Sequence, residues 1–540
     1  MKPTHKIMLI IRDGWGYSTK DPVKTGNAIK LANLKNIPYY EKNYPTAYLA
    51  AHGPAVGLHA GVQGGSEVGH FTIGAGRIVW QEFERINRAI RNKNKKESES
   101  FFHNKMLLKA MQHVKKNHSN LHLMGLFSDE GVHGTTEHLY ALLKMAKANK
   151  VKNVYVHAFL DGRDVPEKCA EKYFKEFNKR SSAIGVGKIA SIMGRYYAMD
   201  RDTNWDRTQL AYDLLVYGKG FIEDGSLKGI LTAMKKAYKY GAESDYYVKP
   251  MKMRGTPNIS DNDAVIFWNF RTDRARQITY AFTNKDFNTS KGKIKNAFRV
   301  KEFKNLLYVC MTNYDRTRKL NCAFPEETVE LNLGKIIANN GLKQLRIAET
   351  EKYPHVTFFF NSQIEKPNKG ETRILVPSPK CPSYAQKPEM SAYIVTDKLL
   401  KELKRSTSRK KDANYDFIAM NFANGDLVGH SGNLNATIKC CKVVDECVGN
   451  IVPAALKKGY VVMMTADHGN CEEMLYPNGE PKPAHSLNPV PFTLISDDNV
   501  DNKWLRKVKL KKGKGLVNIA STILKIMGIS APKNMEEALI

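Results

Sequence analysis

Seven segments of this chain share one pattern: a short, continuous apolar run, followed at once by Asp, Gly, Arg or His and then by a helical stretch. They are KIMLIIRDGWG (6–16), LHLMGLFSDEGVH (121–133), NVYVHAFLDGRD (153–164), KIASIMGRYYAMDRD (188–202), AVIFWNFRTDRAR (264–276), DFIAMNFANGD (416–426) and YVVMMTADHGN (460–470). Strands that are apolar along their whole length and alternate with helices form buried parallel sheets. We therefore predict an α/β protein built from doubly wound sheets.

The polar residues that end these runs mark the expected binding edge, because ligands of open α/β sheets collect at the carboxyl ends of the strands. They are of two chemical kinds. The runs near the two ends of the chain finish on residues typical of metal ligands: Asp13, Asp426, Asp467 and His468. The runs in the middle finish on groups that suit a carboxylate or phosphate clamp: His133, Arg163, Asp164, Arg195, Arg201, Arg271 and Arg274.

This division predicts one domain inserted into another. Basic or polar stretches interrupt the strand pattern at 91–100 and 314–321, where the chain would pass between the two domains. The predicted parts are a discontinuous domain with the metal ligands (1–82 and 325–540), an inserted domain with the arginines (88–315), and linkers that would act as the hinge (83–87 and 316–324).

The net charge of +30, from 84 basic and 54 acidic side chains, raises the question of nucleic-acid binding. Lysines gather in loop-like stretches, which are usually solvated surface: 91–100, 288–296, 404–412 and 507–515. No RNP, KH or zinc-finger signature accompanies them, and a basic surface attracts anionic metabolites by its field alone. We predict a small-molecule substrate and no nucleic-acid partner.

The eight cysteines are scattered without a CxxC pair. This distribution is typical of reduced thiols in the cytosol, not of a disulfide framework or a structural zinc site. The apolar run Ile7–Ile11 is too short for a signal peptide or a membrane span, and we find no transmembrane segment elsewhere. We predict a cytoplasmic protein without a membrane partner.

Six Asp and His residues at strand exits or in one loop form a candidate metal constellation. They are Asp13, Asp426 and His430 in GDLVGHSG, Asp467 and His468 in ADHGN, and His485 in PAHSLNPVPF. A lone His is more often structural, and a lone Asp after a strand usually caps a helix or forms a turn. Together, six oxygen or nitrogen donors without a cysteine are enough for two sites and suit Mn²⁺ or Mg²⁺, with Zn²⁺ as an alternative where histidines dominate.

The loop VQGGSEVGHFTIGAGR (62–77) holds one serine, Ser66, among five glycines. Ser66 could cap a helix, and the glycines could make a tight turn. The loop fits neither a P-loop nor the GxSxG elbow of α/β-hydrolases. A third interpretation is a nucleophile, since two adjacent divalent ions can activate a serine hydroxyl. The loop by itself leaves these interpretations open.

Eleven motifs occur here in one order, from Asp13 to about Phe492. They are DGWG, GGSEVGH with IGAGR, FSDEGVH, DGRD, MGRYYAMDRD, NFRTDRARQ, AETEKYPHVTFF, PEMSA, NGDLVGHSG, TADHGN and AHSLNPVPF. In these motifs the chain resembles the cofactor-independent (2,3-bisphosphoglycerate-independent) phosphoglycerate mutase family of the alkaline-phosphatase-like superfamily. One short motif would be weak, but eleven in order, from both predicted domains, are highly specific.

The resemblance implies an alkaline-phosphatase-like domain with a phosphotransferase domain inserted, and an isomerase that interconverts 3-phosphoglycerate and 2-phosphoglycerate in glycolysis and gluconeogenesis. Ser66 would be the nucleophile that becomes phosphoserine. One metal would be held by Asp426, His430 and His485, and the other by Asp13, Ser66, Asp467 and His468. The substrate-binding groups would be His133, Arg163, Asp164, Arg195, Arg201, Arg271, Arg274 and Lys352.

The resemblance further implies roles for two of these groups: Lys352 close to the transferring phosphate, and Asp164 as acid and base for the glycerate hydroxyls. The two ions would be Mn²⁺, with Mg²⁺, Co²⁺ and Zn²⁺ as alternatives. No 2,3-bisphosphoglycerate would be required, and the protein would be a monomer.

The chain departs from the family pattern at Gly65, where Asn usually precedes the nucleophilic serine, and in its lysine-rich insertions. Two alternatives follow from the residues. Another metal-dependent phosphatase or phosphomutase of the superfamily would share the six Asp and His ligands, but not the arginine-bearing motifs. A basic nucleic-acid-binding protein that has lost catalysis would be supported only by the charge.

Overall fold

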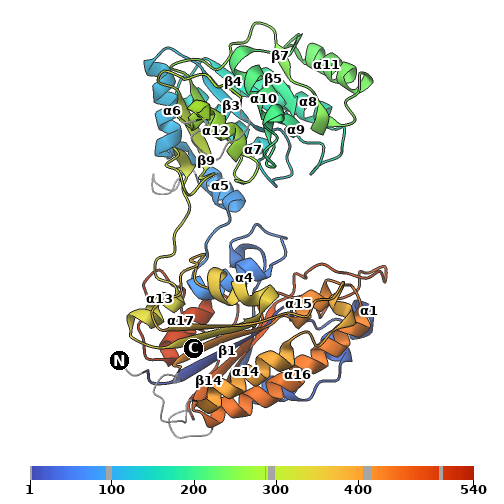
Figure 1. Ribbon diagram of the computed structural model, residues 1–540, viewed down its shortest axis with the longest axis vertical. Coiled ribbons are helices and arrows are strands. Elements are labelled where there is room, and N and C mark those ends of the chain that lie inside the picture. The colour runs from blue at the N-terminus through green and yellow to red at the C-terminus, as the bar shows by residue number, and fades with distance from the viewer. Residues whose placement is uncertain (1–2, 93–99, 286, 290–297, 406–414, 498–502) are drawn as a thin grey trace. The chain divides into compact units, whose positions relative to one another are not determined.

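The computed structural model describes residues 3–92, 100–285, 287–289, 298–405, 415–497 and 503–540 (Figure 1). The chain forms two compact units. Unit 1 comprises Met1–Gln81 and Glu327–Ile540, and unit 2 comprises Glu82–Glu326. Much of the lysine-rich sequence that we expect to be solvated surface (93–99, 290–296 and 406–412) lies outside the described residues. In the remaining stretch, Lys507, Lys509, Lys511 and Lys512 are exposed.

Unit 1 is built on a seven-stranded sheet in the order β12-β11-β13-β1-β14-β15-β2. Its strands are β1 (Lys6–Arg12), β2 (Thr46–Leu49), β11 (Gln344–Glu349), β12 (Glu371–Val376), β13 (Phe417–Phe422), β14 (Tyr460–Thr465) and β15 (Val490–Ile495). The five strands from β12 to β14 are parallel, while β15 is antiparallel to both of its neighbours. The middle of central β1, Ile7–Ile11, is apolar because it is covered on both faces, and these five residues are fully buried.

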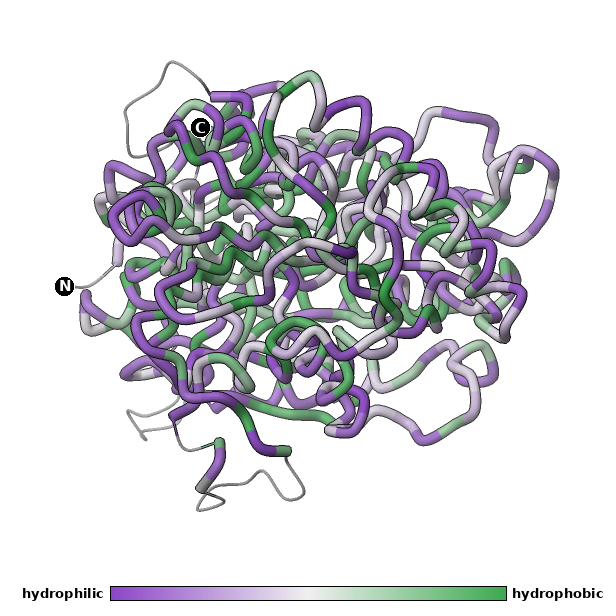
Figure 2. Tube along the Cα trace, turned by 90° about the horizontal axis from the view of Figure 1, so that it is seen from above, coloured by the Kyte–Doolittle hydropathy of each residue, from purple (hydrophilic) through white to green (hydrophobic). Residues whose placement is uncertain are grey.

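The helices of unit 1 connect these strands. They are α1 (Pro22–Thr25), α2 (Ala28–Leu31), α3 (Asn36–Asn43), α4 (Ser66–Ala75), α13 (Leu333–Asn339), α14 (Ala392–Arg405), α15 (Asn424–Gly429), α16 (Leu434–Lys457) and α17 (Asn518–Ile526). Helices α14 and α16 pack side by side on the sheet, and α4 contacts α13 and α17 (Figure 1). Hydrophobic stretches run through the interior and hydrophilic ones along the outer loops (Figure 2).

Unit 2 is built on an eight-stranded sheet in the order β10-β9-β8-β3-β4-β5-β7-β6. Its strands are β3 (Leu121–Leu126), β4 (Val154–Leu160), β5 (Lys188–Gly194), β6 (Phe221–Glu223), β7 (Met251–Met253), β8 (Ala264–Phe267), β9 (Leu307–Thr312) and β10 (Cys322–Phe324). The strands from β10 to β5 are parallel, and β7 is antiparallel to β5.

The helices of unit 2 cover both faces of this sheet. They are α5 (Glu82–Arg91), α6 (Lys105–Lys116), α7 (Thr136–Ala148), α8 (Ala170–Ile184), α9 (Arg195–Ala198), α10 (Trp205–Tyr217), α11 (Leu227–Lys239) and α12 (Arg276–Thr283). Alternate residues of β8 belong to two separate hydrophobic clusters: Ile266 packs with α6, α7 and α8, whereas Val265 packs with α10 and α12. The predicted α/β class, with buried parallel strands, is confirmed.

The passage between the units differs in detail from the expected linkers. Residues 83–87 lie inside α5, and 322–324 form β10 within the sheet of unit 2. The physical reason is that both stretches bury apolar side chains: Ile86 and Ala89 lie on one face of α5, and Ala323 lies in the same hydrophobic cluster. The chain passes between the units at Gln81–Glu82 and Glu326–Glu327.

Candidate active site

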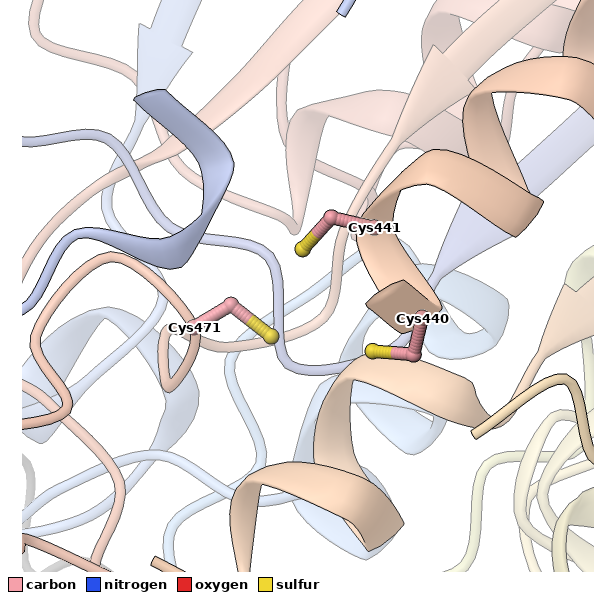
Figure 3. A group of neighbouring side chains, drawn as sticks. All are labelled: Cys440, Cys441 and Cys471. Atoms are coloured by element: carbon pink, nitrogen blue, oxygen red, sulfur yellow. The ribbon is translucent and has the colours of Figure 1, made fainter. Parts of the chain in front are cut away.

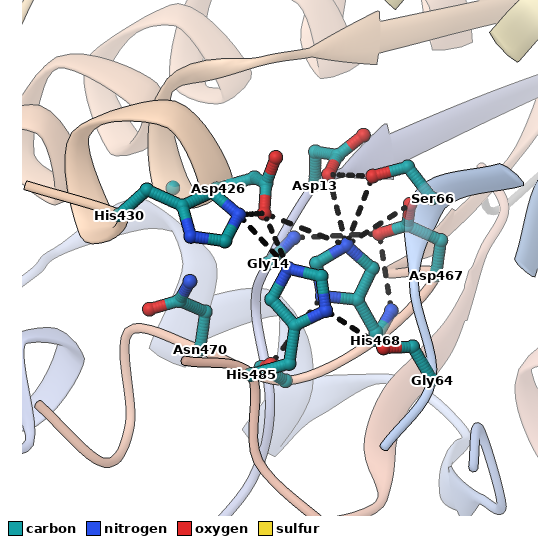
Figure 4. A network of polar contacts seen from close by, with 12 residues as sticks. Asp13, Gly14, Gly64, Ser66, Asp426, His430, Asp467, His468, Asn470 and His485 are labelled. Atoms are coloured by element: carbon teal, nitrogen blue, oxygen red, sulfur yellow. Dashed lines mark hydrogen bonds and ion pairs between the residues drawn. The ribbon is translucent and has the colours of Figure 1, made fainter. Parts of the chain in front are cut away.

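A group of polar side chains gathers at the carboxyl ends of the parallel strands of unit 1 (Figure 4). Asp13 directly follows β1, Asp467 and His468 follow β14, and Asp426 lies in α15 just after β13. The group comprises Asp13, Ser66, Lys352, Asp426, His430, Asp467, His468 and His485. The structure therefore brings together every residue of unit 1 that the sequence analysis selected.

Ser66 is the first residue of α4, and its hydroxyl is directed at the polar group and not at the helix. Gly65 occupies the N-cap position. Ser66 Oγ lies 3.0 Å from Asp13 Oδ1, 3.0 Å from His468 Nε2 and 2.5 Å from Lys352 Nζ. Ser66 is buried. A helix cap would instead accept hydrogen bonds from the first N–H groups of the helix, so the hydroxyl does not act as a cap.

Close backbone approach explains two of the glycines around this group. A Cβ on Gly69 would lie 2.7 Å from the carbonyl oxygen of Asp467, so glycine lets α4 pack directly on the loop after β14. Gly14 has φ +71°, and its Cβ would lie 2.7 Å from the amide nitrogen of Asp426. Glycine is the residue that adopts this left-handed conformation without strain. Both contacts bring ligand-bearing loops together.

His430, His485 and Asp426 present their acceptor atoms to one another. His485 Nε2 lies 3.0 Å from Asp426 Oδ1 and 3.1 Å from His430 Nε2. The Nδ1 atoms face carbonyl oxygens, of Gly64 for His485 and of Pro483 for His430, each at 2.7 Å. A carbonyl only accepts hydrogen bonds, so both Nδ1 atoms carry protons, and in the neutral imidazoles both Nε2 lone pairs face Asp426. Such converging acceptors fit a cation, and the carbonyl partners are typical of metal-ligating histidines.

Asp13, Asp467 and His468 form a second such group. Their ligand atoms all lie within 4.8 Å of one another, as do those of Asp426, His468 and His485. Among the residues that the structure describes, Asp467 Oδ2 is buried without a hydrogen-bond partner. An acceptor of this kind is costly in a protein interior unless a cation or a donor satisfies it. Oxygen and imidazole donors without thiolates fit Mn²⁺, Mg²⁺ or Zn²⁺, so the residues present fit two neighbouring divalent ions.

The electrostatics of this group favour added positive charge. Burial opposes ionisation of Asp426, but the Lys352 ammonium and the neighbouring His430 and His485 side chains hold its pKa well below the usual value. Burial also opposes the charged form of His468, yet Asp467 and Asp13 raise its pKa to about 10. Lys352 lies 2.6 Å from Asp426 Oδ2 and 2.9 Å from Asp13 Oδ1. One buried ammonium and one buried imidazolium thus face three buried carboxylates, those of Asp13, Asp426 and Asp467.

Two supporting residues escaped the sequence analysis. His70 Nδ1 donates to the carbonyl oxygen of Ser66 at 2.9 Å and lies 3.2 Å from Asp467 Oδ2. Asn421 Nδ2 donates to Asp13 Oδ2 at 2.8 Å and lies 3.0 Å from His70 Nε2. His70 lies four residues after Ser66 and therefore on the same face of α4, a spacing that could have revealed it.

In unit 2, Arg195 joins two aspartates near the ends of β4 and β5. Its Nη1 lies 2.6 Å from Asp161 Oδ1 and 2.5 Å from Asp164 Oδ2, and the guanidinium is buried. Asp161 also accepts hydrogen bonds from Ser128 Oγ and from the backbone of the following loop. Asp161 therefore holds the DGRD loop and leaves Asp164 half-buried at its rim.

A second cluster in unit 2 is organised by Asp273, which the sequence analysis did not select. Arg201 Nη1 lies 2.9 Å from Asp273 Oδ2, Arg271 Nε lies 3.2 Å from Asp273 Oδ1, and His133 Nδ1 lies 3.5 Å from the same oxygen. Burial and the nearby positive charges of Arg195 and Arg201 lower the pKa of Arg274.

The residues of unit 2 that the sequence analysis selected accordingly form two clusters that together carry more guanidinium than carboxylate groups, a composition that suits an anion. Arg163 is exposed on the same DGRD loop, and its charge also acts on Arg274.

The fold and the site define an α/β enzyme whose polar centre lies at the carboxyl ends of parallel strands. Residues 90–316 match the family model described as "BPG-independent PGAM N-terminus". The 2,3-bisphosphoglycerate-independent phosphoglycerate mutase of Acetivibrio thermocellus is 46% identical over 99% of both chains. Enzyme 1 of that name from Methanosarcina barkeri is 47% identical over 99% of this chain and 98% of its own.

A crystal structure of phosphoglycerate mutase from Leishmania mexicana, determined at low cobalt concentration, is similar to this chain with a TM-score of 0.57. The two are 28% identical, and the comparison covers 100% of this chain and 99% of the other. The chain belongs to the 2,3-bisphosphoglycerate-independent phosphoglycerate mutase family, and it is an isomerase. Among the helices that the structure describes, none combines the length and apolar composition needed to cross a membrane.

Proposed function

We propose that this enzyme interconverts 3-phosphoglycerate and 2-phosphoglycerate through a phosphoserine intermediate on Ser66, without 2,3-bisphosphoglycerate. The observation that carries the proposal is the surroundings of Ser66 Oγ: a carboxylate, an imidazole and an ammonium lie within 3.0 Å of it. A serine that served only as a turn residue would not need these three groups in a buried site. The location of Ser66 at the start of α4 adds the positive end of a helix dipole, which favours a phosphate there.

In the first half of the reaction, Ser66 Oγ attacks phosphorus in line. The Oγ–H bond and the bond between phosphorus and the glycerate oxygen break, and a bond forms between Oγ and phosphorus. The proton lost by Oγ balances the proton that the glycerate oxygen takes up. Asp13 Oδ1, 3.0 Å from Oγ, orients the serine hydroxyl. Lys352 neutralises charge on the equatorial phosphoryl oxygens, which is the main catalytic task in phosphoryl transfer.

The metal ligands that we propose are Asp426, His430 and His485 for one ion, and Asp13, Ser66, Asp467 and His468 for the other. Divalent ions bound there, with Mn²⁺ as our first choice, would lower the pKa of the serine hydroxyl and attract the phosphoryl oxygens. The support comes from the converging imidazole and carboxylate acceptors described above.

In the second half, glycerate turns its other hydroxyl toward phosphorus and takes the phosphoryl group back. We assign the retention of glycerate to unit 2, where Arg163, Arg195, Arg201, Arg271 and Arg274 offer donors for carboxylate and phosphate oxygens. Asp164 is the proposed acid and base for the glycerate hydroxyls, with His133 as an orienting group. The ion pair between Asp164 and Arg195 orients this carboxylate.

In this assignment, unit 1 carries out the phosphoryl transfer and unit 2 retains the glycerate. A phosphatase would lose the phosphate to water, so excluding water while glycerate is bound is what distinguishes a mutase. All eight cysteines are free, which supports a reducing compartment such as the cytoplasm. A monomer remains our prediction.

The experiment follows 3-phosphoglycerate turnover with Mn²⁺, with and without added 2,3-bisphosphoglycerate, in the parent enzyme and in Ser66→Ala. Ser521→Ala, a buried serine on α17, is the matched control. We expect equal rates with and without the cofactor, no turnover in Ser66→Ala and parent turnover in the control. Phosphate release without mutase turnover would favour the phosphatase alternative, and substantial turnover in Ser66→Ala would reject the phosphoserine route.

A further inference from the structure

Three cysteines lie close together in unit 1 (Figure 3), and none of them is among the candidate metal ligands. Cys440 and Cys441 are adjacent on α16, and Cys471 lies in the loop after β14. Their Sγ atoms are all within 4.8 Å of one another, and all three side chains are fully buried. The reaction proposed above uses none of them.

The three sulfurs are thiols whose present partners are weak. Cys440 Sγ donates to the carbonyl oxygen of Thr437 at 3.1 Å, and Cys471 Sγ donates to that of Gly425 at 3.1 Å. Burial raises the pKa of the Cys440 and Cys441 thiols well above the usual value. A proton on sulfur forms only a weak hydrogen bond, so a soft metal ion could replace these protons with stronger bonds.

The spacing fits three sulfur ligands around one ion. With a metal–sulfur bond of about 2.3 Å, sulfurs are about 4.0 Å apart in a trigonal arrangement and about 3.8 Å apart in a tetrahedral one. Separations of no more than 4.8 Å can close to these values through small side-chain movements. Thiolates select soft ions, whereas the carboxylates and imidazoles around Ser66 favour harder ones. The two groups of ligands therefore differ in the ions they prefer.

A buried positive charge lies near the cluster. Arg12, at the end of β1, is fully buried, and its Nη2 atom has no hydrogen-bond partner among the described residues. Its charge lowers the pKa of Cys441, although the larger effect of burial prevails. A nearby guanidinium stabilises the excess negative charge that three thiolates would retain around one metal ion.

We propose that Cys440, Cys441 and Cys471 form a site for one soft, thiophilic metal ion, and that occupancy of this site slows the mutase. On binding, three S–H bonds break, three sulfur–metal bonds form and the protons leave to solvent. No oxidant or reductant is needed.

Cys471 connects metal binding at the three cysteines to the rate of turnover. Its backbone N–H donates to the carbonyl oxygen of Gly14 at 3.0 Å, and its thiol contacts the carbonyl oxygen of Gly425, the residue before Asp426. A metal ion that draws Cys471 toward α16 removes the thiol's hydrogen bond to Gly425 and shifts the loops that carry Asp13 and Asp426. Slower turnover follows from the displacement of these two carboxylates.

The test is an anaerobic titration of the reduced full-length enzyme with Cd²⁺, in the presence of excess Mn²⁺. Ultraviolet absorption from sulfur-to-cadmium charge transfer reports thiolate ligands and is silent for cadmium bound to carboxylates or imidazoles. We expect the band to grow linearly and saturate at one Cd²⁺ per chain, with turnover falling in parallel.

Cysteine variants show which sulfurs bind the Cd²⁺. Cys471→Ser, and independently Cys440→Ala in case the first variant does not fold, should lose most of the band and resist the inhibition. Cys447→Ser is the matched control, because Cys447 is also buried on α16 but lies outside the cluster. Cys322→Ser is a second control. Cys322 lies beside Cys310 on the neighbouring strand of unit 2, so these two thiols are another place where Cd²⁺ could bind sulfur.

The proposal stands if the two cluster variants lose the band and both controls keep it. A band that persists in Cys471→Ser and Cys440→Ala, or that disappears in Cys322→Ser, overturns the site. A band that saturates at one equivalent without any loss of turnover overturns the coupling. Because the primary readout is spectroscopic, it is independent of whether Ser66 carries the phosphate.

Discussion

His430 and His485 face each other with their Nε2 atoms 3.1 Å apart, while the Nδ1 atom of each donates to a backbone carbonyl oxygen. Two neutral imidazoles in this arrangement direct lone pairs at each other and at Asp426. The arrangement is unfavourable unless a proton or a metal ion lies between them, and Asp426 raises the pKa of His430 accordingly. It is the clearest sign in unit 1 of a metal site.

The first prediction concerns this metal site. Removing metal with a chelator should abolish turnover, and Mn²⁺ should restore it. Asp426→Asn should lower the number of bound ions by one per chain, because an amide replaces the carboxylate shared by His430 and His485. Metal content is measured by elemental analysis after gel filtration. Asp397→Asn, which changes an exposed residue of α14, is the control. Unchanged metal content in Asp426→Asn would refute the assignment.

The second prediction concerns Lys352, whose ammonium lies 2.5 Å from Ser66 Oγ. Lys352→Met should lower kcat by about 10²–10³-fold, the usual cost of removing one donor that stabilises a transition state. KM should change much less. Steady-state kinetics on 3-phosphoglycerate test this, with the exposed Lys401 on α14 changed to Met as control. An equal loss in kcat for both variants would argue against a direct role.

The third prediction concerns the retention of glycerate in unit 2. Asp273→Asn should loosen Arg201 and Arg271, which both pair with it. The expected result is a higher KM and a larger share of turnovers that release inorganic phosphate. Coupled assays of 2-phosphoglycerate and phosphate measure this share. Glu137→Gln breaks an exposed ion pair with Arg180 elsewhere in unit 2 and should leave the share unchanged. A parent-like share in Asp273→Asn would contradict the role of this cluster.

The fourth prediction concerns stability and pH. Burial raises the pKa of Glu349 from 4.5 to about 7, although Ser378 Oγ donates to it. Between these pH values the folded state binds more protons than the unfolded state. The free energy of unfolding should therefore fall as pH rises, by up to about 1.4 kcal/mol per pH unit.

Glu349→Gln should remove this contribution. The difference in unfolding free energy between the parent and Glu349→Gln, measured by urea denaturation from pH 4.5 to 7.5, should change across that window and level off above it. Parallel curves for the two proteins would show that Glu349 titrates normally.

The sequence predicts the central strands of unit 1 well, and it groups the candidate site residues, for a physical reason. A strand segment buried on both faces must be apolar along its length, as Ile7–Ile11 is, and parallel strands end at one edge of a sheet. Asp13, Asp426 and Asp467 could therefore be grouped without coordinates. Their pairing in space, 3.3 Å between His468 Nε2 and Asp13 Oδ1 for example, depends on sheet order, which the sequence does not reveal.

Residues that act through tertiary contacts were not predictable in the same way. Asn421 lies inside β13 and looks like an ordinary interior residue until the sheet places β13 beside β1. Asp273 could be any helix-capping aspartate until Arg201, 72 positions away, pairs with it. The expected linkers extend into α5 and β10 of unit 2, because Ile86 and Ala323 bury their side chains there.

The measurement that most directly tests the central claim is rapid acid quenching of the Mn²⁺-loaded enzyme with excess 3-phosphoglycerate, followed by peptide mass spectrometry of residues 62–77. We expect phosphate on Ser66 in the parent enzyme, formed and discharged at least as fast as turnover. Phosphate on another residue, or turnover without any phosphorylated peptide, would contradict the account.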